Sequence, residues 1–156
     1  RLSDLLRPTL LAVPAPWRTF EDTVRGLVRL VRPHEPLTLP QETQVAEAVL
    51  AREAVASTAI LEIGIGVPHA RLPALTRPWL AIAAAPDGLY EPVPLVRIGI
   101  VALLLSPQSA VELHLQTLAA LSVLFRSHDL RTALLRARNA ADALAVIAAH
   151  DHRDTR

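Results

Sequence analysis

Apolar residues recur at helical spacing in the first third of the chain. One stripe begins just after Thr19, and Asp22 stands three residues beyond that threonine in a capping-box arrangement, so the pattern predicts a helix capped by Thr19. The residues of this stripe are Phe20, Val24, Leu27, Val28 and Val31. A second stripe predicts a helix from Pro40, a residue suited to a first helical turn, to about Glu53.

The middle of the chain, from Ser57 to Leu105, has a different pattern of short apolar runs broken by proline and glycine. Runs of this kind predict strands. The expected strands are residues 58–63, 64–67, 79–85 and 96–105. The last of these is uninterrupted by polar residues from Ile98 to Leu105, which is typical of a strand buried on both faces of a sheet.

Helical spacing returns at Ser106, which we expect to cap a helix that has Pro107 in its first turn and His114 on its buried stripe. Two shorter helices are predicted after it, one beginning near His128 and the last capped by Asn139. The order of helices, strands and helices predicts one α/β domain built in layers.

Length and charge narrow the class of protein. The 156 residues suit one compact domain, and the formal net charge of +1 provides no general attraction to nucleic acid or to anionic lipid. No apolar run approaches the roughly 20 residues that span a bilayer, and the first residues carry no signal-peptide pattern. The sequence contains no methionine, so we expect residues 1–156 to be a domain excised from a longer protein.

The side chains that the sequence lacks exclude several kinds of chemistry. All 16 basic residues are arginine, which excludes a Schiff-base lysine and the lysine of a phosphate-binding loop. The chain has no cysteine, so thiolate nucleophiles, disulfides and thiolate zinc ligands are excluded. Its few aromatic residues do not suffice for a platform on which bases stack.

Three polar residues stand where an apolar residue or a strand end is expected. Arg52 and His114 lie on predicted buried stripes, and His69 follows Pro68, so it should emerge at a strand end or edge. Singly, each has a structural explanation, as a snorkelling arginine or a hydrogen-bonded histidine. Together, two imidazoles and a guanidinium suit the handling of an anion: one imidazole can be phosphorylated, the second can donate a hydrogen bond to the phosphoryl oxygens, and the guanidinium can hold two of those oxygens.

Metal binding by the histidines is the alternative interpretation of this set. It is weaker, because no carboxylate stands at helical i+4 spacing from His69 or His114. The run His150-Asp151-His152 could chelate a divalent ion, but it follows the last predicted helix, and we expect it to be a frayed terminus.

Several short motifs follow one another in a characteristic order. They are Ala51-Arg52-Glu53, Ala56-Ser57-Thr58, Val67-Pro68-His69-Ala70, Leu104-Leu105-Ser106-Pro107 and His114-Leu115. This combination resembles the mannitol/fructose-type enzyme IIA domain of the bacterial sugar phosphotransferase system, including its nitrogen-regulatory branch. The resemblance covers essentially the whole chain, and it implies a single α/β domain in which a mixed β-sheet is flanked by helices on both faces.

The resemblance also implies roles for the three polar residues. His69 would be phosphorylated by the phosphohistidine of the small carrier HPr, with His114 and Arg52 supporting the phosphoryl group. No metal and no organic cofactor is implied. The expected partners are an HPr-like phosphocarrier and a IIB domain or the membrane domain of a transporter, in the cytoplasm and without nucleic acid. The sequence does not decide between a monomer and a homo-oligomer.

The chain departs from the family pattern before His69. Ala59 and Leu61 stand where glycines are expected, and Glu62 adds a negative charge that would repel a phosphohistidine if it pointed inward. A IIA-like regulatory module that binds a partner without being phosphorylated is therefore the alternative function. For either function we expect a partner to dock on an apolar surface around His69. The candidate residues of that surface are Leu72, Leu75, Trp79 and the proline-rich segment up to Pro94.

Overall fold

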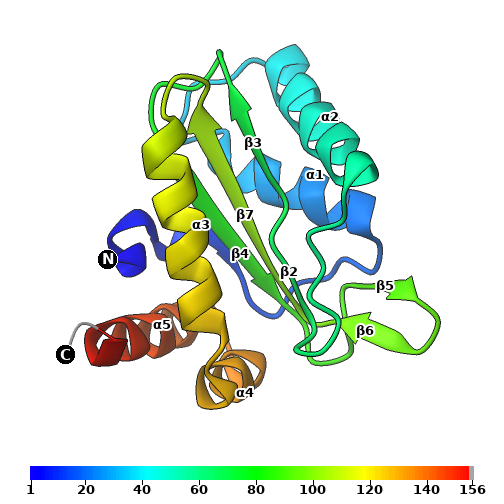
Figure 1. Ribbon diagram of the computed structural model, residues 1–156, viewed down its shortest axis with the longest axis vertical. Coiled ribbons are helices and arrows are strands. Elements are labelled where there is room, and N and C mark those ends of the chain that lie inside the picture. The colour runs from blue at the N-terminus through cyan, green and yellow to red at the C-terminus, as the bar shows by residue number, and fades with distance from the viewer. Residues whose placement is uncertain (155–156) are drawn as a thin grey trace.

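The computed structural model describes residues 1–154, with side chains described through Asp151. A five-stranded mixed sheet is covered by helices on both faces (Figure 1), which confirms the predicted fold class. The strands are β1 (Leu11–Ala12), β2 (Ile65–Gly66), β3 (His69–Leu72), β4 (Trp79–Ala84), β5 (Tyr90–Val93), β6 (Val96–Ile98) and β7 (Ile100–Pro107). The helices are α1 (Phe20–Val31), α2 (Leu39–Val55), α3 (Val111–Phe125), α4 (His128–Arg136) and α5 (Ala140–Asp154), preceded by the short 3-10 helices η1 (Leu2–Leu5) and η2 (Pro8–Leu10).

Strand β7 organises the sheet. The strand order is β1-β4-β7-β2, and β3 pairs with β7 further along that strand. Both β2 and β3 run parallel to β7, whereas β4 runs antiparallel to it. Strands β5 and β6 form a separate hairpin, which projects from the lower end of the sheet in Figure 1. Because β3 has β7 as its one partner among the described strands, its second edge is open.

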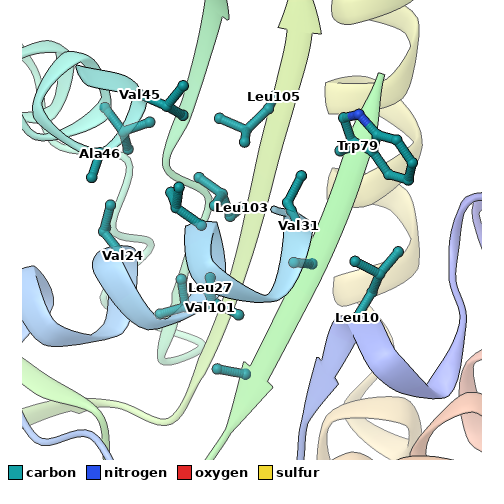
Figure 2. Close-up of a cluster of buried hydrophobic side chains, with 14 of the residues drawn as sticks. Leu10, Val24, Leu27, Val31, Val45, Ala46, Trp79, Val101, Leu103 and Leu105 are labelled. Carbon is teal, nitrogen blue, oxygen red and sulfur yellow. The ribbon is translucent and has the colours of Figure 1, made fainter. Parts of the chain in front are cut away.

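Two clusters of buried side chains hold the layers together. One lies between the sheet and α1 with α2, and the other lies between the sheet and the helices α3, α4 and α5. In Figure 2, which shows the first cluster, α1 contributes Val24, Leu27 and Val31, and β7 contributes Val101, Leu103 and Leu105. On the other face of β7, Ile100 and Ala102 belong to the second cluster. Burial on both faces explains the continuous apolar run in the sequence.

The helix boundaries follow local capping signals. Thr19 accepts a hydrogen bond from the backbone N–H of Asp22 at 3.0 Å, as predicted. Helix α2 begins one residue before Pro40, and the last helix begins after Asn139, whose side chain accepts from the N–H of Asp142 at 2.9 Å. These caps are local interactions, so the sequence alone predicts them. Among the described residues, no helix is long and apolar enough to cross a lipid bilayer.

Two strand predictions were wrong, and strands β3 and β5 were not predicted. The predicted strand 58–63 is largely a turn, closed by the N–H of Ile60 donating to the carbonyl of Ile65 at 2.7 Å and allowed by the positive φ of Gly64. The predicted strand 96–105 is interrupted at Gly99 and divides into β6 and β7. Strand β5 was not predicted at all, and it forms because β6 lies beside it.

The predicted helix start at Ser106 was also wrong. Strand β7 continues through Pro107, because β3 pairs with it as far as Leu72 opposite Pro107, and α3 begins at Val111. Ser106 is therefore a buried strand residue rather than a helix cap. The longer strand places the Ser106 hydroxyl beside α3, within hydrogen-bond distance of His114.

Candidate functional site

A groove of about 450 Å³ lies along the open edge of the sheet, between α2, β3 and the first turns of α3. Figure 1 shows β3 in green between α3 in yellow and α2 in cyan. All three residues predicted for the site line this groove, although they come from three separate elements. The lining residues are Ala48, Arg52, His69, Ala70, Arg71, Leu72, Gln108, His114, Leu115 and Leu118.

His69 is the first residue of β3 and is half-buried. Its Nδ1 lies 2.8 Å from the carbonyl oxygen of Val67. A carbonyl oxygen can only accept a hydrogen bond, so the hydrogen of the neutral ring is on Nδ1 and the lone pair is on Nε2. Nε2 is therefore the ring nitrogen of a neutral His69 that carries a free lone pair.

His114 lies on α3 opposite His69, with the centroids of the two rings 5.2 Å apart and the ring planes inclined at 60°. Its side chain is buried, and its Nδ1 lies 2.8 Å from the hydroxyl oxygen of Ser106. Burial, as the largest cause, and the neighbouring charges of His69 and Arg71 together lower the pKa of His114 from its ordinary 6.5 to about 4. At neutral pH His114 is therefore an uncharged hydrogen-bonding group.

This lowered pKa predicts a loss of stability in mild acid. Between pH 6.5 and 4 the unfolded chain binds a proton at His114 that the folded protein does not bind, so the free energy of unfolding falls as the pH falls through this window. Urea unfolding at several pH values measures the effect. The substitution His114→Gln, which keeps a polar side chain beside Ser106, is expected to reduce the slope over that window. An NMR titration of folded His114 with a midpoint at its ordinary value would contradict the prediction.

Arg52 lies near the C-terminus of α2, three residues before the helix ends, and its side chain is exposed along the groove. Its Nη1 donates a hydrogen bond to the carbonyl of Ala56 at 3.1 Å. This contact satisfies a carbonyl at the end of its own helix, where a cation is favourable. The remaining N–H groups of the guanidinium can donate hydrogen bonds to an anion in the groove.

Arg71 is a further cation of the groove that the sequence analysis missed. It follows His69 by two residues on β3, so both side chains leave the same face of the strand. Its Nη1 donates to the carbonyl of Gln108 at 2.9 Å, and its charge is one of the causes of the lowered pKa of His114. The sequence analysis placed His69 at a strand end or edge. If the strand had been predicted to begin at His69, the i, i+2 spacing would have indicated Arg71 as a second residue of the site.

Glu62 does not contribute negative charge to the lining of the groove. It is exposed in the turn 61–64 before β2, and it is not among the lining residues. The altered residues of this segment, Ala59 and Leu61, belong to the same turn region rather than to the groove. The charged side chains that line the groove are thus the arginines.

Two of the predicted docking residues are part of the core. Leu75 and Trp79 are each only 4% exposed, and Trp79 Nε1 donates to the carboxylate of Glu35 at 2.7 Å. That prediction is wrong, because apolar residues next to a site can equally fill the interior. Leu72 does line the groove, and on α3 the exposed apolar residue beside the histidines is Leu115.

The predicted frayed terminus is helical instead. Helix α5 runs to Asp154, and Asp151 is buried and accepts a hydrogen bond from the N–H of Ser3 at 2.7 Å. His150 Nδ1 contacts the carbonyl of Val146, and the side chain of His152 lies outside the described residues. In the part of the chain that is described, no three His, Asp or Glu side chains are grouped to hold a metal ion.

The family model described as "Phosphoenolpyruvate-dependent sugar phosphotransferase system, EIIA 2" matches residues 13–150 of this sequence. The chain therefore belongs to this family of enzyme IIA domains, as the motifs around Arg52 and His69 predicted.

Individual relatives come from both the sugar and the nitrogen branches. The chain is 33% identical over 106 residues to the PTS system fructose-specific EIIABC component of Bacillus subtilis, and 34% identical over 94 residues to the PTS system fructose-specific EIIA component of Haloferax volcanii. These matches cover 67% and 60% of this chain but 16% and 60% of the relatives. The Nitrogen regulatory protein of Bradyrhizobium diazoefficiens is 28% identical over 148 residues, which is 94% of each chain.

Solved structures share the fold. The nitrogen regulatory protein IIA-Ntr from Neisseria meningitidis superposes with a TM-score of 0.75 at 21% identity, covering 94% of this chain and 98% of that one. Enzyme IIAMtl from Escherichia coli, in its complex with phosphorylated IIBMtl, gives 0.72 at 17% identity, covering 92% and 97%. At this level of identity the likeness shows the arrangement of helices and strands.

Proposed function

We propose that this domain is a phosphocarrier in which Nε2 of His69 accepts a phosphoryl group from the phosphohistidine of an HPr-type carrier. The domain then passes the group to a partner or uses it as a regulatory signal. The observation that carries this proposal is the hydrogen bond from His69 Nδ1 to the Val67 carbonyl, which leaves the lone pair on Nε2. The membership of the chain in the EIIA family supports the same reaction.

The transfer exchanges one nitrogen–phosphorus bond for another. The lone pair of His69 Nε2 forms a bond to phosphorus while the bond to the donor imidazole breaks, and the donor leaves with its electron pair. The proton on His69 Nδ1 stays in place, so the ring becomes cationic, and the Val67 carbonyl stabilises this charge. No proton has to move during the step.

The other groove residues hold the phosphoryl oxygens. In the proposal, Arg71 and Arg52 turn guanidinium N–H groups toward them, since both line the groove with His69. His114 is neutral, and with the Ser106 hydroxyl donating to its Nδ1, its Nε2–H is free to donate to the same oxygens. Positioning and charge stabilisation are what a loose phosphoryl-transfer transition state requires.

The partner that receives the phosphoryl group is proposed by analogy with the relatives. One solved neighbour is a complex of IIAMtl with phosphorylated IIBMtl, and one relative carries EIIA within a longer EIIABC chain. We propose a IIB domain or a regulated membrane transporter as the acceptor, with residues 1–156 as one domain of a larger cytoplasmic-facing protein. Leu115 and Leu72 on the rim of the groove would lie in that interface.

Phosphorylation of the wild-type protein tests the function directly. The domain is incubated with phosphoenolpyruvate, enzyme I and HPr, and intact mass is expected to rise by one phosphoryl group. Tandem mass spectrometry should place the group on His69, and phosphorus–nitrogen NMR coupling should assign it to Nε2. No mass gain, with the same enzyme I and HPr active on another IIA domain, would overturn the carrier and favour a binding module that is not phosphorylated.

A further inference from the structure

The end of α2 is tied to the loop before β2 by a carboxylate and a hydroxyl. Glu53, next to Arg52 on α2, accepts a hydrogen bond from the backbone N–H of Thr58 at 2.7 Å. Both of its carboxylate oxygens also lie 2.9 Å from the hydroxyl oxygen of Thr58. Since a carboxylate accepts, the hydroxyl hydrogen of Thr58 points to Glu53. The lone pairs of that hydroxyl are then free to accept.

The same hydroxyl reaches the segment that carries His69. Thr58 Oγ1 accepts a hydrogen bond from the backbone N–H of Val67 at 3.1 Å. The carbonyl of Val67 in turn accepts from His69 Nδ1 at 2.8 Å. Pro68 lies between them, and its ring restricts the backbone on both sides of Val67's carbonyl. The direction of that carbonyl therefore depends on how the N–H of Val67 is held.

Glu53 has no competing role in an ion pair, because among the described residues no arginine or histidine forms one with it. It lines the same pocket as Tyr90. The hydroxyl of Tyr90 is buried without a hydrogen-bond partner in the described part of the chain, and both burial and the negative charge of Glu53 raise the pKa of Tyr90. The contacts that the carboxylate makes are thus directed to Thr58.

We propose that Glu53 and Thr58 are positioning residues that hold His69 as the Nδ1–H tautomer, through the chain of contacts Glu53, Thr58, Val67 and His69. The proposal rests on the proposed function, in which Nε2 is the acceptor nitrogen. Neither residue touches the phosphoryl group. Without the Thr58 hydroxyl, the Val67 carbonyl is no longer aligned with Nδ1, and the imidazole distributes its hydrogen over both nitrogens.

Thr58→Val tests this proposal, because valine has nearly the same shape and lacks the hydroxyl. Nitrogen NMR of His69 is expected to show the Nδ1–H tautomer in the wild type and a mixture in the variant. The initial rate of phosphorylation is expected to fall about 10-fold, the factor that corresponds to losing one hydrogen bond of ordinary strength. Thr58→Ser, which retains the hydroxyl, should restore both the tautomer and the rate.

The neighbouring Ser57→Ala is the matched control, because within the described part of the chain the Ser57 hydroxyl accepts from the N–H of Ala59 and has no hydrogen bond with Val67 or His69. It should leave the His69 tautomer unchanged. Glu53→Gln provides a second variant if Thr58→Val fails to fold, and it should shift the tautomer in the same direction. An unchanged tautomer in these variants, or a shifted tautomer with an unchanged rate, would overturn the proposal. Absence of transfer in the wild type would instead count against the proposed function, and the tautomer would still be measurable.

Discussion

Replacement of His69 by alanine is expected to abolish phosphorylation of the domain completely. In the proposed mechanism the other groove residues hold the phosphoryl oxygens, and His69 Nε2 supplies the lone pair that forms the bond to phosphorus. Removing the atom that forms the bond removes the reaction rather than slowing it. Intact mass after incubation with phosphoenolpyruvate, enzyme I and HPr measures the phosphorylated fraction.

His128→Ala is the matched control for that experiment. His128 is an exposed histidine at the start of α4, outside the groove. The control should gain one phosphoryl group as the wild type does. The prediction fails if His69→Ala still gains the group, because the acceptor would then be another residue.

Replacement of Arg71 by alanine is expected to slow phosphoryl transfer by about 100-fold, the loss typical of removing one preorganised donor to a developing negative charge. Arg71 shares a strand face with His69, and its charge acts on His114. Arg52→Ala should have a smaller effect, about 10-fold, because Arg52 lies on α2 rather than on the strand of His69, and its charge is not among those that lower the pKa of His114. Rapid-quench rates with phosphorylated HPr measure both.

Arg71→Lys separates charge from geometry. Lysine keeps the positive charge but lacks the planar guanidinium that can donate hydrogen bonds to two oxygens at once. This variant should therefore recover only part of the lost rate. Arg138→Ala is the control, because Arg138 is exposed near the start of α5 and pairs with Asp142 away from the groove. Equal rates for wild type and Arg71→Ala would show that Arg71 does not hold the phosphoryl group.

Together these variants separate the two functions that the sequence left open. A carrier loses transfer with His69→Ala and slows with the arginine variants. A module that only binds a partner would show no transfer in the wild type, so the arginine variants would have no transfer rate to change. The geometry favours the carrier, because the lone pair of Nε2, two guanidinium groups and a neutral imidazole line one groove without a carboxylate.

The helix caps, the buried positions and the three candidate residues of the site can be predicted from the sequence alone. The caps at Thr19 and Asn139 are interactions between residues three apart, so local patterns predict them. The apolar stripe of α1 and the continuous apolar run of β7 predicted which residues are buried. Arg52 and His114 were recognised because they interrupt apolar stripes, and His69 because it follows a proline. The family resemblance added the roles that are proposed for them.

Only the tertiary structure decided how these residues meet. Periodicity shows which face of an element is buried, but it contains no information about which strand pairs with which or in what register. Pairing with β3 extends β7 through Ser106, and this places the Ser106 hydroxyl on His114. The same pairing brings Arg71 into the groove, and the turn at Gly64 returns Val67 to Thr58. These contacts lie beyond the reach of capping and periodicity patterns, so they depend on the packed fold.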